Sequence, residues 1–103
     1  MPDTPSYFGF DWDEGNARKN EKQGVTKAEV EQVFLNVPLL LADDRKHSNS
    51  EPRFHALGRS DLERRLHVTF TEREDGTLIR PISARPMSRK EGAVYEKAVE
   101  AHS

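Results

Sequence analysis

Apolar residues recur at helical spacing in two segments, and each segment begins with a capping box. In the first, Thr26 and Glu29 have the N-cap and N3 spacing, and Pro38 closes the segment. In the second, Ser88 and Glu91 have the same spacing. The apolar faces of these expected helices are Val30, Val33, Phe34 and Val37 in the first, and Val94, Tyr95, Ala98 and Val99 in the second.

Ahead of the first amphipathic helix, the pattern predicts a short strand and a polar helix. Residues 7–12 alternate like a short strand and stop at Asp13, which is a good N-cap. Residues 14–22 are polar and compatible with a helix, and Gly24 ends it. Because 14–22 has almost no apolar face, we expect this helix to lie on the surface.

Strand patterns fill the chain between the two amphipathic helices. Residues 66–73 alternate cleanly, Asp75-Gly76 predicts a hairpin turn, and 77–85 forms the partner strand. Pro81 cannot donate a hydrogen bond to a neighbouring strand, so its strand is expected to be an edge or to carry a bulge. Weaker strand patterns occupy 39–42 and 53–59.

These elements predict one domain over residues 1–103 with an α+β fold. Two N-terminal helices precede a small antiparallel sheet of three or four strands, and a C-terminal helix follows. The helices are segregated from the strands, and the open face of the sheet carries polar groups.

Composition narrows the class of protein. The chain has 103 residues, of which 34% are hydrophobic and 33% charged, enough for one thin core layer but not for a large catalytic cavity. The absence of cysteine excludes disulfides, thiolate chemistry and the usual zinc sites. The longest apolar stretch, 39–42, is far short of a membrane span, and no secretory signal is visible. We therefore expect a cytoplasmic protein that does not contact a membrane.

Positive charge is concentrated in the middle of the chain. Residues 53–90 hold nine Lys or Arg residues and five Asp or Glu residues, although the net charge of the protein is −2. Eight of these nine basic residues are arginines, which suit bidentate binding of phosphate. Such a face is typical of local nucleic-acid binding, and the alternative is an ordinary solvated sheet face.

Arg73, Arg80 and Arg85 lie on the two strands of the expected hairpin. The alternation of a strand places Arg80 and Arg85 on opposite faces, unless Pro81 marks a bulge that resets the register. A cluster of guanidinium groups suits cleavage of a phosphodiester, because it stabilises the charge that develops on the phosphate. The alternative is that each arginine forms a surface ion pair or covers the core.

RNA carries its own nucleophile, the 2′-hydroxyl, so the protein needs only to orient, deprotonate and stabilise the substrate. The candidate bases are His55, His67 and Glu72. The four histidines are too scattered along the sequence to predict a metal site.

Several motifs resemble those of the BrnT family of ribonuclease toxins from type II toxin–antitoxin systems. They run in the family's order over residues 10–96, and the combination is more specific than any one of them. They are FDWDEGN at 10–16, GVT at 24–26, VF at 33–34, EPRFHALGR at 51–59, FTER at 70–73, IRPISARPMSRKE at 79–91 and YE at 95–96.

The resemblance implies a compact RelE-like fold and RNA cleavage without metal or cofactor. It also implies a BrnA-type ribbon-helix-helix antitoxin that forms a heterotetramer with the toxin, DNA being bound only through the antitoxin. The motifs assign catalysis to Arg73, Arg80 and Arg85, and the expected substrate-binding residues in or beside them are Lys22, Arg53, His55 and Arg89.

One departure from the family bears on activity. The family usually has a histidine where this chain has Gln23, and an amide is neither an acid nor a base at neutral pH. The alternative to an active ribonuclease is therefore a non-catalytic module, either a degenerate toxin that acts as a corepressor partner or an RNA-binding protein. Under either interpretation, we expect the antitoxin to dock on the apolar stripes of the helices that begin at Thr26 and Ser88.

Overall fold

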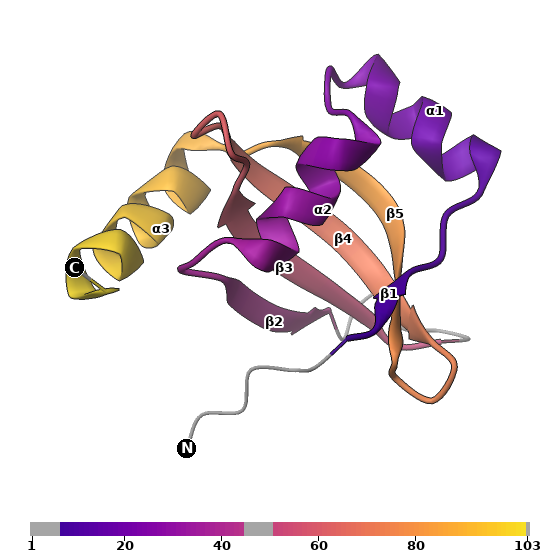
Figure 1. The fold of residues 1–103 in the computed structure, drawn as a ribbon. Helices are drawn as coiled ribbons and strands as arrows, with labels where there is room; N and C mark the ends of the chain where they lie inside the picture. The colour runs from indigo at the N-terminus through magenta and orange to yellow at the C-terminus, as the bar shows by residue number, and fades with distance from the viewer. Residues whose placement is uncertain (1–6, 45–50, 103) are drawn as a thin grey trace.

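The structure is a computed structural model that describes residues 7–44 and 51–102. Its frame is a five-stranded sheet with the order β1-β5-β4-β3-β2 (Figure 1). The strands are β1 (Gly9–Phe10), β2 (Leu40–Asp44), β3 (Arg53–Arg59), β4 (Arg65–Arg73) and β5 (Leu78–Pro86). The helices are α1 (Glu14–Lys22), α2 (Lys27–Leu35) and α3 (Arg89–His102).

The sheet is mixed, and this corrects the expected fold. The strands β2 to β5 are antiparallel neighbours, but β1 pairs with β5 in parallel, with Gly9 opposite Leu78. The RelE-like order of two N-terminal helices, a small antiparallel sheet and a C-terminal helix is therefore wrong, because a strand precedes the helices and joins the sheet. The free edge of β5 explains this pairing, since the amide of Asp11 donates to the carbonyl of Ile79 at 2.8 Å.

The middle of one sheet face is covered by α2, whereas the described side chains of α1 are exposed. Val30 and Val33 of α2 are fully buried against the sheet. Gly58 on β3 permits the close approach, because a Cβ atom there would lie 2.7 Å from Cγ1 of Val33. The core also contains Ala56, Leu66, Val68, Phe70, Ile79 and Ala84 from β3, β4 and β5.

Both predicted capping boxes are present. The Thr26 hydroxyl accepts from the amide of Glu29 at 3.2 Å, and the Ser88 hydroxyl accepts from the amide of Glu91 at the same distance. The first amphipathic helix ends earlier than expected, at Leu35.

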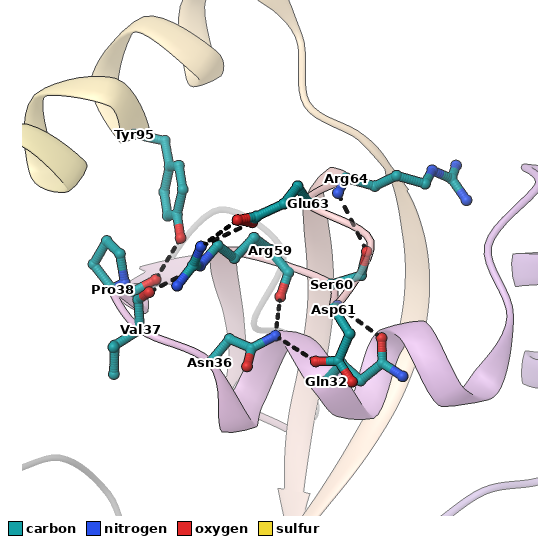
Figure 2. Close-up of polar contacts among 10 residues, drawn as sticks. All are labelled: Gln32, Asn36, Val37, Pro38, Arg59, Ser60, Asp61, Glu63, Arg64 and Tyr95. Atoms are coloured by element: carbon teal, nitrogen blue, oxygen red, sulfur yellow. Dashed lines mark hydrogen bonds and ion pairs between the residues drawn. The ribbon is translucent and has the colours of Figure 1, made fainter.

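Polar contacts join the end of α2 to the β3–β4 hairpin (Figure 2). The side-chain amide of Asn36 donates to the carbonyl of Arg59 and to the carboxylate of Asp61, both at 3.0 Å. Tyr95 of α3 is fully buried, and its hydroxyl donates to the carbonyl of Pro38 at 2.7 Å. The segment after α2 is thus held by both the hairpin and the C-terminal helix.

Candidate functional site

A β-bulge in β5 decides which residues share a sheet face. Thr69 pairs with Ser83, but the next residue of β4, Phe70, pairs with Pro81, so Ile82 is the extra residue. Beyond the bulge, Thr71 pairs with Arg80. The bulge therefore resets the register of β5, which is the alternative that the sequence analysis leaves open at Pro81.

As a result, the three predicted catalytic arginines lie on one face. Arg85 is opposite His67 and Arg80 is opposite Thr71, and His67, Thr71 and Arg73 point to the same side of β4 because they are an even number of residues apart. This face is opposite the one that α2 covers. Arg85 and Arg80 are separated by four residues along β4, about 13 Å at 3.3 Å per residue, so they form two groups rather than one.

One group, here called the arginine group, consists of Arg53, Arg73 and Arg80. Arg73 forms a bidentate ion pair with Glu51, and Arg80 donates to Asp11 at 3.0 Å and to Asp13. The hydrogen bond from Arg73 holds the pKa of Glu51 below its usual range, and the charges of Arg80 and Arg53 lower it further. Guanidinium groups and carboxylates therefore alternate at this end of the face, with Glu51 bound to Arg73, and Asp11 and Asp13 bound to Arg80.

The other group lines a cavity of about 460 Å³ between the sheet and α3, here called the histidine groove. Its polar walls are His55, His67, Arg85 and Glu91, and its apolar walls are Leu40, Ala42, Leu57 and Val94. The imidazole rings of His55 and His67 come from adjacent strands, and their centroids are 4.8 Å apart. The groove thus combines a cation, two imidazoles and an apolar surface.

Glu91 holds Arg85 in the groove. The guanidinium donates two hydrogen bonds to the carboxylate, at 2.8 and 2.9 Å. These bonds, with a smaller contribution from the backbone amide of Ser88, lower the pKa of Glu91 to about 2. A carboxylate with so low a pKa is a weak base, so Glu91 fixes the position of Arg85 rather than accepting protons at neutral pH.

His67 is nearly buried, at 9% exposure. Burial lowers its pKa, and the positive charge of Arg85 lowers it further. The ring is therefore neutral at pH 7 and has a nitrogen that can accept a proton.

His55 is held from two sides. Its Nε2 lies 3.0 Å from Oδ2 of Asp44, and its Nδ1 lies 3.3 Å from the hydroxyl of Thr69. Along β4, Thr69 lies between His67, which is opposite Arg85, and Thr71, which is opposite Arg80. Both ring nitrogens of His55 are thus held while the ring lines the histidine groove.

Among the remaining candidates, Glu72 is on the wrong face. It accepts a hydrogen bond from the hydroxyl of Tyr7 at 2.7 Å, and Tyr7 packs against Phe34 of α2. Lys22 is exposed at the end of α1, and Arg89 is exposed in the first turn of α3. Neither Lys22 nor Arg89 lines the histidine groove.

Glu91 is a site residue that the sequence pattern does not identify, because in the sequence it serves only as the N3 residue of a capping box. The signal was its position six residues after Arg85, but the contact depends on where α3 begins.

Across residues 7–44 and 51–102, no three His, Cys, Asp or Glu side chains are grouped so as to hold a metal ion. Within the same ranges, no helix is long and apolar enough to cross a membrane.

Comparison with known proteins assigns the family. Among curated proteins, none matches the chain. A family model described as the ribonuclease toxin BrnT of a type II toxin–antitoxin system matches residues 12–91, which include β2 to β5, the arginine group and the polar walls of the histidine groove. The chain therefore belongs to the BrnT family of type II toxin–antitoxin ribonuclease toxins.

Proposed function

We propose that this chain is an endoribonuclease toxin that cleaves RNA in the histidine groove. The observation that carries the proposal is the position of Arg85, whose guanidinium lies in one cavity with His55 and His67. A guanidinium bound to the scissile phosphate stabilises the negative charge that develops on it. Since the guanidinium supplies that charge and RNA supplies the nucleophile, the proposed reaction needs no metal.

The arginine group supports binding of the same RNA strand. Arg80 and Arg73 lie further along the polar face, about 13 Å or more from Arg85, so they suit neighbouring phosphates rather than the scissile one. Arg53 belongs to the same group. For Lys22 and Arg89, we propose contacts with RNA beyond the groove.

Membership of a type II system implies an antitoxin partner. We propose that the partner is a BrnA-type ribbon-helix-helix protein, that the complex is a heterotetramer, and that it binds DNA only through the antitoxin. The stripe of α2 is largely buried in the core, and this limits the docking surface to its exposed end. Leu35 is 77% exposed there and lines an apolar groove of about 340 Å³ with Phe8, Phe10 and Phe34.

The direct test is to express the chain alone and measure growth and RNA integrity. We expect growth arrest and RNA fragmentation by the wild type, and neither by Arg85→Ala at the same soluble level. Arg18→Ala on the exposed face of α1 is the matched control and should remain toxic. Intact RNA and normal growth with the soluble wild type would contradict the proposal.

A second function is favoured by one observation. Each predicted catalytic arginine is already bound to a carboxylate: Arg73 to Glu51, Arg80 to Asp11 and Asp13, and Arg85 to Glu91. A guanidinium that is already paired is less available to a phosphate, which favours a degenerate toxin that is kept as a corepressor partner. The two functions are distinguished by Arg85→Ala, which abolishes toxicity only in an active nuclease, while antitoxin binding is retained in both.

A further inference from the structure

We propose that His67 and His55 are the general base and the general acid of RNA cleavage in the histidine groove, with Arg85 bound to the scissile phosphate. The substrate is then a ribonucleotide strand with a 2′-hydroxyl beside the cleaved bond. This inference rests on the ribonuclease function proposed above and adds to it the proton-transfer residues.

The first support is geometric. His55 on β3 and His67 on β4 are diagonal neighbours, since His55 pairs with Thr69 and His67 pairs with Leu57. Their ring centroids are 4.8 Å apart, and both rings line the cavity that holds Arg85. Two proton-transfer groups and one phosphate-binding cation therefore converge in one cavity, which is the set that cleavage of a phosphodiester requires.

The second support is that the two rings have different surroundings. His67 is nearly buried beside the Arg85–Glu91 ion pair, and its Nε2 is 4.0 Å from Oε2 of Glu91. Burial and Arg85 both lower its pKa, so it is unprotonated and ready to accept a proton. His55 instead has the Asp44 carboxylate 3.0 Å from Nε2, in position to balance the charge of an imidazolium. The two rings therefore differ in their partners, since His67 lies beside a cation and His55 beside a carboxylate, and we assign the base and the acid on this difference.

The reaction balances without another reactant. The 2′-oxygen attacks phosphorus as its proton moves to His67, and a bond forms between the 2′-oxygen and phosphorus. The bond from phosphorus to the 5′-oxygen breaks, and that oxygen takes the proton from Nδ1 of His55, which gives up its contact with the Thr69 hydroxyl while Nε2 stays on Asp44. The products are one strand that ends in a 2′,3′-cyclic phosphate and one that begins with a 5′-hydroxyl. Proton exchange with water then restores both rings.

The apolar half of the groove provides room for the nucleoside next to the cleaved bond. Leu40, Leu57 and Val94 form an apolar wall beside the two imidazoles. Apolar contact between a base and aliphatic side chains does not depend on a hydrogen-bonding pattern, so this wall gives affinity with little sequence selectivity.

The test compares three substrates with the purified full chain: an RNA oligonucleotide, its all-2′-deoxy counterpart, and the RNA with sulfur in place of the 5′-oxygen at the mapped cleavage site. A sulfur leaving group departs without protonation, so it bypasses a general acid. We expect RNA to yield a 2′,3′-cyclic phosphate and the deoxy strand to remain intact. We expect His67→Gln and His55→Asn each to lower kcat by about 100- to 10,000-fold on RNA.

On the sulfur substrate, His55→Asn should recover to within about tenfold of the wild type, whereas His67→Gln should not. His102→Gln, at the exposed end of α3, is the matched control and should cleave normally. Variants that cleave RNA at nearly the wild-type rate would overturn the assignment of both histidines. A His55→Asn defect that persists on the sulfur substrate would overturn the acid role.

The pH dependence of kcat for the wild type tests the same assignment without requiring that any variant folds. The kcat should rise with pH as His67 loses its proton. The charged groups that face the two rings are Arg85 from β5, Glu91 from α3 and Asp44 from β2. A kcat that does not rise between pH 5 and 8 would overturn the base role of His67 while the nuclease stands, whereas a wild type that cleaves no RNA would overturn the proposed function itself.

Discussion

Arg85 and Glu91 form a two-point ion pair across the junction between β5 and α3, with N–O distances of 2.8 and 2.9 Å. Glu91 also closes the capping box of α3, because its carboxylate accepts from the amide of Ser88 at 2.9 Å. One side chain thus starts the helix and holds the guanidinium in the groove. Stability and the geometry of the site are coupled at this residue.

Glu91→Gln should lower the free energy of unfolding by about 1–2 kcal/mol at pH 7 and remove part of its pH dependence. The folded pKa of about 2 lies below the ordinary value of 4.5, so the contribution is fully present above pH 4.5 and is lost as the pH falls toward 2. Urea unfolding of the wild type and the variant between pH 2 and 7 measures this difference.

Glu96→Gln is the control for Glu91→Gln, because Glu96 pairs with Arg65 on the outer side of α3 and takes no part in the cap. Its carboxylate is half-exposed, so the loss should be smaller. Equal pH profiles for wild type and Glu91→Gln would contradict the role of Glu91.

Two glycines offer a matched pair for testing the packing of α2 on the sheet. Gly58→Ala should lower the free energy of unfolding by about 1–3 kcal/mol, because the added Cβ would lie 2.7 Å from a side-chain atom and 3.0 Å from the backbone oxygen of Val33. Gly92→Ala places the same methyl group in open space within α3 and should raise stability by about 0.5–1 kcal/mol. Thermal unfolding of both variants measures the contrast, and equal effects would refute it.

Local signals in the sequence predicted most of the elements. The capping boxes at Thr26 and Ser88 predicted where two helices begin. The Asp75-Gly76 turn lies between β4 and β5, where the hairpin was expected. Each of these signals involves residues within a few positions of one another.

The features that the sequence left open or did not reveal depend on distant contacts. The Ile82 bulge is decided by which residues of β5 face Phe70, and the parallel pairing of β1 depends on an open edge of β5 that lies about 70 residues away. The acidic partner of Arg80 is equally remote, since Asp11 precedes it by 69 residues. Sequence spacing therefore placed the three arginines on the strands of the hairpin but could not divide them into two groups.

The docking surface proposed for the antitoxin can be tested with two residues of equal exposure. Leu35 at the end of α2 and Leu62 in the β3–β4 hairpin are both 77% exposed, but only Leu35 lines the apolar groove beside β1. Leu35→Asp should weaken antitoxin binding by tenfold or more, while Leu62→Asp should leave it unchanged. Isothermal titration with the purified antitoxin measures both. Unchanged affinity for Leu35→Asp would place the antitoxin elsewhere.

The arginine group makes a prediction about salt. If Arg73 binds an RNA phosphate, Arg73→Ala should raise KM more than it lowers kcat, and should reduce the slope of log affinity against log salt by about 0.7, the value for one phosphate contact on a single strand. Arg85→Ala should instead reduce kcat, because its guanidinium acts on the charge that develops at the scissile phosphate. The measurement is cleavage of one oligonucleotide at several salt concentrations.

Glu51→Gln is the internal control for the salt prediction. It removes the carboxylate that now binds Arg73 without removing the guanidinium, so RNA should compete more easily for Arg73 and KM should fall. Opposite changes in KM for Arg73→Ala and Glu51→Gln indicate that phosphate replaces the carboxylate when RNA binds. If both variants leave KM and the salt slope at their wild-type values, the Arg73–Glu51 pair is structural and the RNA strand does not reach this end of the sheet.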